Sequence, residues 1–145
     1  MIETISKPKI LCVDSDPLTA DWVTAVLARA QIICSIETVG KGRDAFGLLI
    51  NEEIDLCVME YALPDMTGVQ LCGLLRQIGC KVPVLFFSAM NRPIDRELAN
   101  AAGANEYLEK PDDLDIFADA VKFLLKRREP LSIQRPSQPL YALAA

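Results

Sequence analysis

Short apolar runs alternate with amphipathic segments along this chain, and the alternation repeats five times. The apolar runs lie at about residues 10–13, 32–39, 55–60, 82–87 and 106–108. After each run, apolar residues recur at helical spacing, as Val23, Val26 and Leu27 do after the first. Strands that alternate with helices in this way are typical of a parallel sheet, so the pattern predicts an α/β fold with five strands and five helices.

Capping residues and glycines mark several helix ends. Asp16 stands directly before Pro17, a pair typical of an N-cap and a first helical turn. Gly79 and Gly103 predict where the third and fourth helices end. The fifth helix is expected to end at the basic run of residues 126–128, because cations are favoured at a helix C-terminus.

Residues 129–145 differ in composition from the rest, since they hold three of the nine prolines and show no helical period. We therefore expect one domain over residues 1–128 and a flexible C-terminal tail over residues 129–145. With only a tail after the domain, we expect any output to come through another protein.

The charge of the chain disfavours polyanionic partners. The 15 basic and 20 acidic side chains give a net charge of −5, so we expect no nucleic-acid and no membrane partner. The N-terminus lacks the apolar core of a signal peptide, and no apolar run approaches the ~20 residues of a membrane span. The sequence thus predicts a cytoplasmic protein.

The composition also removes several kinds of site. Histidine is absent, which excludes Ser-His-Asp and Cys-His catalysis and imidazole zinc sites. The five cysteines form no CxxC pair, and we interpret them as buried free thiols in a reducing compartment. A redox sensor is the alternative, but it would need an exposed, electropositive setting for a cysteine, of which the sequence gives no sign.

Polar residues follow four of the five predicted strands. They are Asp14, Ser15 and Asp16 after the first strand, Glu60 after the third, Ser88 after the fourth and Lys110 after the fifth. In an open parallel sheet, ligands bind at the carboxyl ends of the strands. Each residue alone has an ordinary explanation, such as helix capping by Asp16, but their joint placement predicts one shared site.

With these residues in place, the chain resembles the receiver domain of response regulators over about residues 8–128. Four motifs match in order and spacing: ILCVDSDP at 10–17, DLCVME with LPDMTG at 55–68, Ser88-Ala89, and GANEYLEKP at 103–111. The resemblance implies a flavodoxin-like, doubly wound, five-stranded parallel sheet with strand order 2-1-3-4-5. It also implies two-component (phosphorelay) signalling, in which an aspartate ending the third strand takes a phosphoryl group from a histidine kinase.

The resemblance assigns roles residue by residue. The switch hydroxyl falls on Ser88, the switch aromatic on Tyr107 and the phosphate-pairing lysine on Lys110. The phospho-acceptor position falls on Glu60, where the family has aspartate. The Mg²⁺ ligands would be Asp14, Ser15, Glu60 and the backbone carbonyl of Ala62, with Asp16 as a conceivable replacement for the missing second carboxylate.

Two departures from the family pattern bear on the chemistry. Glu60 carries one methylene more than aspartate, which moves its oxygens by roughly an ångström, and such a displacement can cost about 10²-fold in rate. Ser15 replaces a charged Mg²⁺ ligand with a neutral hydroxyl, and Asp16 is expected to cap a helix, so the metal site should be weak or empty. Apart from weak Mg²⁺, we expect no cofactor.

We therefore interpret the chain as a degenerate receiver, a binding module and not an enzyme, in which Glu60 pairs with Lys110. It would dock a protein partner, a histidine kinase being one candidate, through its fourth helix, fifth strand and fifth helix. The alternative is a working phospho-acceptor that uses Mg²⁺ and either Glu60 or the nearby Asp65. A nucleotide or flavin binder is disfavoured, because no glycine-rich loop follows the first strand.

Overall fold

The computed structural model describes residues 6–134, and this part of the chain forms five strands and five helices in strict alternation. The strands are β1 (Lys9–Val13), β2 (Ser35–Val39), β3 (Leu56–Met59), β4 (Val84–Ser88) and β5 (Glu106–Glu109). The helices are α1 (Pro17–Arg29), α2 (Gly42–Asn51), α3 (Gly68–Gln77), α4 (Pro93–Ala101) and α5 (Leu114–Gln134).

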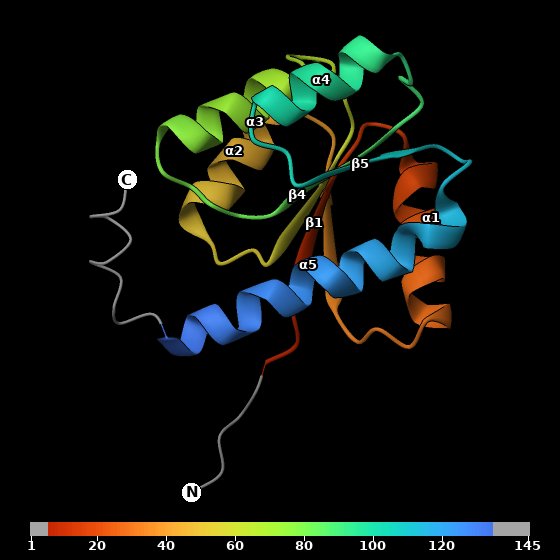
Figure 1. Ribbon diagram of the computed structural model, residues 1–145, viewed down its shortest axis with the longest axis vertical. Helices are drawn as coiled ribbons and strands as arrows, with labels where there is room; N and C mark the ends of the chain where they lie inside the picture. Colours follow the sequence, from red (N-terminus) through yellow and green to blue (C-terminus); the bar gives the residue numbers. More distant parts are fainter. Residues whose placement is uncertain (1–5, 135–145) are drawn as a thin grey trace, which may run out of the picture.

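All strands pair in parallel in one sheet of order β2-β1-β3-β4-β5, which confirms the order and the flavodoxin-like fold implied by the sequence. Helices α2, α3 and α4 cover one face of this sheet, and α1 and α5 cover the other (Figure 1). The order reverses between β1 and β3, so the loops after these two strands diverge and leave an edge open to a ligand or a partner.

Each face of the sheet has its own hydrophobic core. Along β1, Leu11 and Val13 pack under α2 and α3, whereas Ile10 and Cys12 pack under α1 and α5. Burial on both faces explains why the strands appear in the sequence as continuous apolar runs and not as alternating ones. The core therefore fixes the sheet rigidly beneath the loops at its carboxyl edge.

The predicted helix signals hold at three places. The Asp16 side chain accepts a hydrogen bond from the backbone N–H of Leu18 at 3.0 Å and caps α1. Gly79 and Gly103 follow α3 and α4 with φ of 85° and 108°, a left-handed conformation that glycine adopts without strain.

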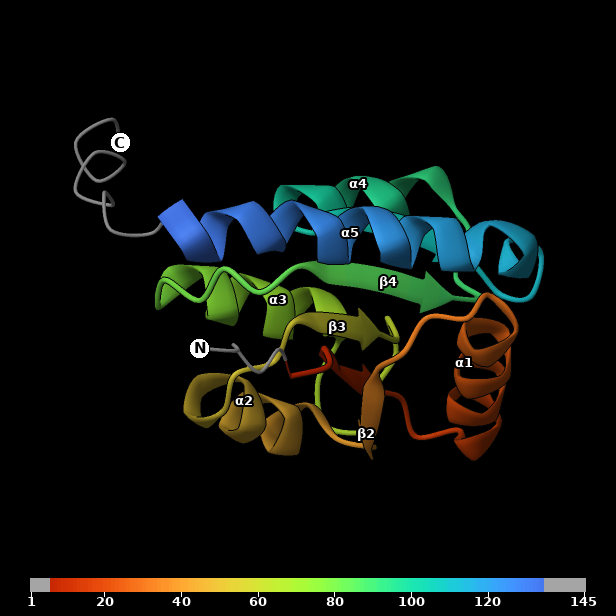
Figure 2. The ribbon, with the colours of Figure 1, turned by 90° about the horizontal axis from the view of Figure 1, so that it is seen from below.

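Two predicted boundaries are wrong. The second strand begins at Ser35, and not near residue 32, because the chain first turns at Gln31 with φ of 60° and Ile32 bonds back to Leu27. The last helix does not end at residue 128 but continues to Gln134. Its final part extends past the start of β4 (Figure 2), where the helix covers no sheet and needs no apolar period. Residues 135–145 of the expected tail lie outside the described residues.

The cysteines are buried only in part. Cys12, Cys57 and Cys72 are buried, whereas Cys34 and Cys80 are half-buried, because they lie in the turns before β2 and β4 and not within the core. Burial raises the pKa of Cys12 to about 12 and raises the pKa of Cys57 as well, so these thiols stay protonated and unreactive. Within residues 6–134, no helix has the length and apolar character needed to cross a bilayer.

Candidate functional site at the strand ends

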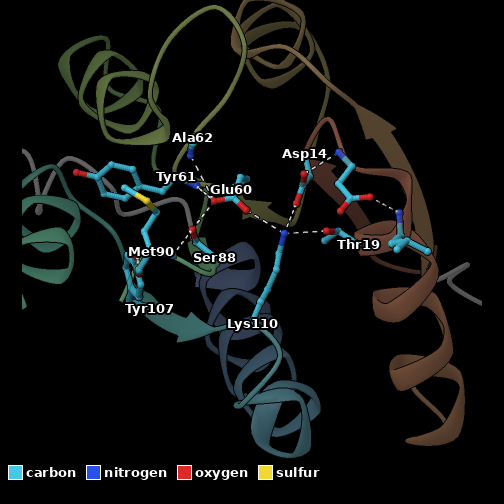
Figure 3. Close-up of polar contacts among 11 residues, drawn as sticks. Asp14, Thr19, Glu60, Tyr61, Ala62, Ser88, Met90, Tyr107 and Lys110 are labelled. Atoms are coloured by element: carbon cyan, nitrogen blue, oxygen red, sulfur yellow. Dashed lines mark hydrogen bonds and ion pairs between the residues drawn. The ribbon is translucent and has the colours of Figure 1, made fainter. Parts of the chain in front are cut away.

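Four of the six polar residues predicted from the sequence meet where β1, β3, β4 and β5 end (Figure 3): Asp14, Glu60, Ser88 and Lys110. The register pairs Val13 with Met59 and Ser88 with Glu109, so the residues that follow these strands stand side by side. Two backbone hydrogen bonds extend the pairing past the strands, from Glu60 to Val13 at 2.9 Å and from Lys110 to Ser88 at 2.9 Å. The sheet itself thus brings Asp14, Glu60, Ser88 and Lys110 together.

The Lys110 ammonium lies at the centre of this group. It donates to the Asp14 carboxylate at 2.6 Å, the Thr19 hydroxyl at 2.8 Å and the Glu60 carboxylate at 2.9 Å. An ammonium carries three N–H donors, so all of them are used. The three charged side chains are only 12%, 5% and 13% exposed for Lys110, Asp14 and Glu60. The ammonium therefore holds two carboxylates together in a nearly dry setting.

The pKa of Lys110 reflects this arrangement. Burial acts to lower the pKa of the ammonium, but the hydrogen bonds to Asp14 and Glu60, with their attraction, outweigh it and raise the pKa above its ordinary value. Lys110 thus stays charged at any physiological pH.

The Glu60 carboxylate is saturated with donors. Its Oε1 faces Lys110, and its Oε2 accepts from the Ser88 hydroxyl and from the backbone N–H groups of Tyr61 at 2.6 Å and Ala62 at 3.3 Å. The Ala62 position thus contributes an N–H to Glu60, whereas the resemblance assigned its carbonyl to a metal. The side chain of Glu60 is fixed by four donors from four residues, and both oxygens are engaged.

The switch aromatic lies inside the protein. The Tyr107 hydroxyl donates to the Met90 carbonyl at 2.6 Å, and the Tyr107 ring stacks on Phe86 with 5.5 Å between centroids and 8° between planes. Only 6% of Tyr107 is exposed, and burial raises the pKa of its phenol to about 12. The Met90 N–H donates to the Ser88 hydroxyl at 3.1 Å, so Met90 connects the hydroxyl and the aromatic through its own backbone.

Thr19 and Met90 belong to this site but were not predicted from the sequence. Thr19 is 2% exposed on α1, and a hydroxyl five residues after Asp14, on the inward side of the predicted helix, was a signal that could have identified it. Met90 contributes only backbone atoms to this network, so its residue type carries no signal.

The loop after β1 places its other polar residues elsewhere. Ser15 and Asp16 are exposed, the Asp16 carboxylate caps α1, and the Asp16 N–H donates to Asp14 at 2.9 Å. Of the ligands that the resemblance implies for Mg²⁺, Asp14 and Glu60 are thus held by protein donors, and Ser15 and Asp16 lie outside the cluster. As these residues lie, they do not fit an octahedral cation that needs several free oxygens.

Asp65, the alternative phospho-acceptor, has a structural role in the loop after β3. Its carboxylate accepts from the backbone N–H groups of Gly42 at 2.8 Å and Arg43 at 3.0 Å, at the start of α2. The hydrogen bonds from Arg43 and Gly42 lower the pKa of Asp65. Asp65 therefore ties the loop after β3 to a neighbouring helix.

Comparisons with known proteins agree with the fold and with the order of the motifs. The family model of the response regulator receiver domain matches residues 10–126. Response regulator protein PmrA of Pseudomonas aeruginosa is 34% identical over 119 residues, which are 82% of this chain and 53% of PmrA. An uncharacterized 14.6 kDa protein of Leptolyngbya boryana is 34% identical over 114 residues, 77% of this chain and 86% of that protein. The chain thus spans about half the length of PmrA but most of the smaller relative.

Solved structures show the same architecture. The receiver domain of the Francisella response regulator 1452 has a TM-score of 0.75 at 25% identity, over 83% of this chain and 98% of that one. The signal receiver domain of a LuxO repressor protein from Vibrio parahaemolyticus has a TM-score of 0.80 at 23% identity, over 88% and 97%, and shares the fold. With the family model matched over most of its length, this chain belongs to the response regulator receiver domains of two-component signalling.

Proposed function

We propose that this receiver signals by docking a protein partner, without conventional phosphorylation at the acceptor position. The observation that carries the proposal is the set of contacts made by Glu60. Its carboxylate meets both the Lys110 ammonium and the Ser88 hydroxyl, the two groups that the family resemblance assigns to sensing a phosphoryl group. The permanent carboxylate of Glu60 thus makes contacts that the family resemblance assigns to a transient phosphoryl group.

The same contacts make Glu60 a poor nucleophile. Phosphoryl transfer depends on in-line positioning and on neutralisation of charge. Attack by either oxygen of Glu60 would require the loss of donors that now hold it, and the longer side chain would still be misplaced. We accordingly propose that the domain works without Mg²⁺ and without enzymatic turnover.

The docking face that we propose consists of α4, β5 and α5. Ile94 and Leu98, one helical turn apart on α4, are 45% and 44% exposed, and Phe123 on α5 is 62% exposed. Tyr107 lies on β5 between the two helices. Exposed apolar side chains beside a buried aromatic suit a protein partner, and a histidine kinase is one class that could use this face.

Labelling with a small-molecule phosphodonor tests the proposal. The wild-type chain, incubated with acetyl phosphate and Mg²⁺, should show no acyl phosphate by intact-mass spectrometry. The double variant Ser15→Asp with Glu60→Asp restores both family carboxylates and should become labelled. The single variant Glu60→Asp is the matched control, because it restores the acceptor alone.

A phosphoryl group mapped to Glu60 of the wild-type chain would refute the proposal and support the phospho-accepting alternative. A phosphoryl group on Asp65 would do the same, and it would also require the loop after β3 to leave its contacts with α2.

A further inference from the structure

Arg96 on α4 makes three contacts with β5 and its surroundings. Its guanidinium donates to the backbone carbonyl of Tyr107 at 3.1 Å and to the Glu109 carboxylate at 2.7 Å. The guanidinium carbon also lies over the Tyr107 ring, 5.1 Å from its centroid, a distance typical of a cation–π contact. One side chain thus contacts the Tyr107 ring, the Tyr107 carbonyl and the side chain two residues further along β5.

The Tyr107 ring is covered by two neighbours of different origin. Phe86 stacks on it from the adjacent strand β4, within the core. Arg96 covers it from α4, and its side chain is 41% exposed, so the guanidinium lies between the ring and the solvent. Since Phe86 is fully buried, Arg96 is the cover that can move away.

A second arginine fixes the start of α4. Arg92 donates to the Asp95 carboxylate at 2.7 Å and 3.0 Å, and Asp95 is fully buried. This pair lies at the start of α4, and Arg92 follows two residues after Met90, whose carbonyl accepts from the Tyr107 hydroxyl. Arg96 comes one turn after Arg92 and is therefore presented from an anchored helix end.

The link from Glu60 to Tyr107 is indirect by comparison. Its hydrogen bonds run from Glu60 to Ser88, and from Ser88 through the Met90 backbone to the Tyr107 hydroxyl. The Ser88 hydroxyl also acts directly on the Tyr107 phenol, where it opposes the rise in pKa that burial causes. The contact with Arg96 is direct and includes a charged hydrogen bond.

We propose that Arg96 is the positioning residue that keeps the Tyr107 ring inside the protein. Arg96 and Glu109 then set the position of the switch aromatic, Tyr107, separately from the switch hydroxyl, Ser88, which is held by Glu60. The inference rests on the proposed function only in that the docking face includes Tyr107. A partner that draws Arg96 away from Glu109 would uncover the ring while Glu60 keeps its contacts.

The test measures the position of the ring directly. In chains labelled with ¹³C at the tyrosine rings, a soluble nitroxide broadens the ring signals that reach solvent, and contacts with the Phe86 ring report the inward state. Arg96→Ala should lower the inward-to-outward ratio of Tyr107 by about fivefold, since the cation–π contact exists only while the ring lies inward. Glu60→Gln should change the ratio by no more than about twofold, because Glu60 is hydrogen-bonded to Ser88 and not to Tyr107 itself.

Arg29→Ala is the matched control, because Arg29 is an exposed arginine on α1 and should leave the Tyr107 signals unchanged. Glu109→Gln removes the ionic partner while keeping Arg96, and it should shift the ratio in the same direction by a smaller factor. This variant decides the matter if Arg96→Ala fails to fold.

The inference would be overturned if the inward-to-outward ratio of Tyr107 were the same as in the wild type in both the Arg96 and the Glu109 variants. It would also be overturned if Glu60→Gln changed this ratio more than Arg96→Ala does. Phosphodonor labelling is scored in a separate experiment, so a label on Glu60 would refute the proposed function and leave the result on Arg96 standing.

Discussion

Two groups of polar residues lie at the same edge of the sheet and behave in opposite ways. Glu60, Ser88 and Lys110, which end or follow β3, β4 and β5, turn toward one another and share hydrogen bonds. Ser15 and Asp16, which follow β1, are exposed, and Asp16 caps α1. A place at the carboxyl end of a strand therefore brings a residue near the site but does not decide whether its side chain enters.

The difference comes from the segment that leaves each strand. Helix α1 begins at Pro17, only four residues after β1 ends. The Asp16 carboxylate therefore accepts from a free N–H group at the start of this helix, that of Leu18. The residues after β3 and β5 instead have their backbones tied across the sheet edge, from Glu60 to Val13 and from Lys110 to Ser88. Asp16 has thus become part of a helix cap, whereas Asp14, Glu60, Ser88 and Lys110 form one hydrogen-bonded group.

Among the predicted changes, the removal of Lys110 from the group that it forms with Glu60 and Ser88 should lower the free energy of unfolding most. Lys110→Met leaves the Asp14 and Glu60 carboxylates buried with no cation between them, and the loss of one member of such a cluster should destabilise the fold by about 3 kcal/mol at pH 8. Urea unfolding measures this loss.

Lys122→Met serves as the control, since Lys122 is an exposed lysine on α5. A loss for Lys110→Met no larger than for Lys122→Met would mean that the three charges do not hold one another in solution.

The wild-type fold should lose stability at alkaline pH. The pKa values of Lys110 and Tyr107 are both raised in the fold, that of Tyr107 to about 12, so both groups bind their protons more tightly when folded than when unfolded. Their stabilisation is therefore complete below the unfolded pKa values of about 10 and declines as the pH rises through the folded values. The buried thiols of Cys12 and Cys57 have raised pKa values as well, so they add to this decline from their unfolded pKa of about 8.5 upward. The free energy of unfolding, followed by urea titration from pH 8 to pH 11, should therefore begin to fall above about pH 8.5 and fall more steeply above about pH 10.

Tyr107→Phe removes one of the titrating groups and should make the decline above about pH 10 shallower. Equal slopes for the variant and the wild type would show that the Tyr107 phenol is not buried in solution as it is in the structure.

The sequence predicted the fold and the centre of the site but not its edges. The alternation of apolar runs with helical segments predicted an α/β fold, and the receiver motifs then implied its strand order. Both features depend only on which residue types occur at which positions. The pairing of Glu60 with Lys110 was also predicted, since the two side chains are of opposite charge and follow strands that end at the same edge of the sheet. Which other groups join them depends on burial and backbone position, and these exist only in the folded chain.

Thr19 and Met90 illustrate this limit. Thr19 enters the site because α1 docks with that side inward, and Met90 acts through its N–H and carbonyl, which every residue except proline carries. The continuation of α5 to Gln134 was missed for a related reason. Beyond the sheet, a helix has no apolar pattern to reveal it.

The smallest effects should separate helix capping from site chemistry in the loop after β1. Asp16→Ala should lower the free energy of unfolding by about 1 kcal/mol, the ordinary value of a lost N-cap. Ser15→Ala should change it by no more than about 0.5 kcal/mol. Asp21→Ala is the control, because it removes an exposed carboxylate from α1 without touching the cap. Addition of Mg²⁺ should leave all these differences in the free energy of unfolding unchanged. If Mg²⁺ stabilised the wild type but neither the Ser15 nor the Asp16 variant, both residues would have to turn inward in solution, and the two groups at this edge would be one site after all.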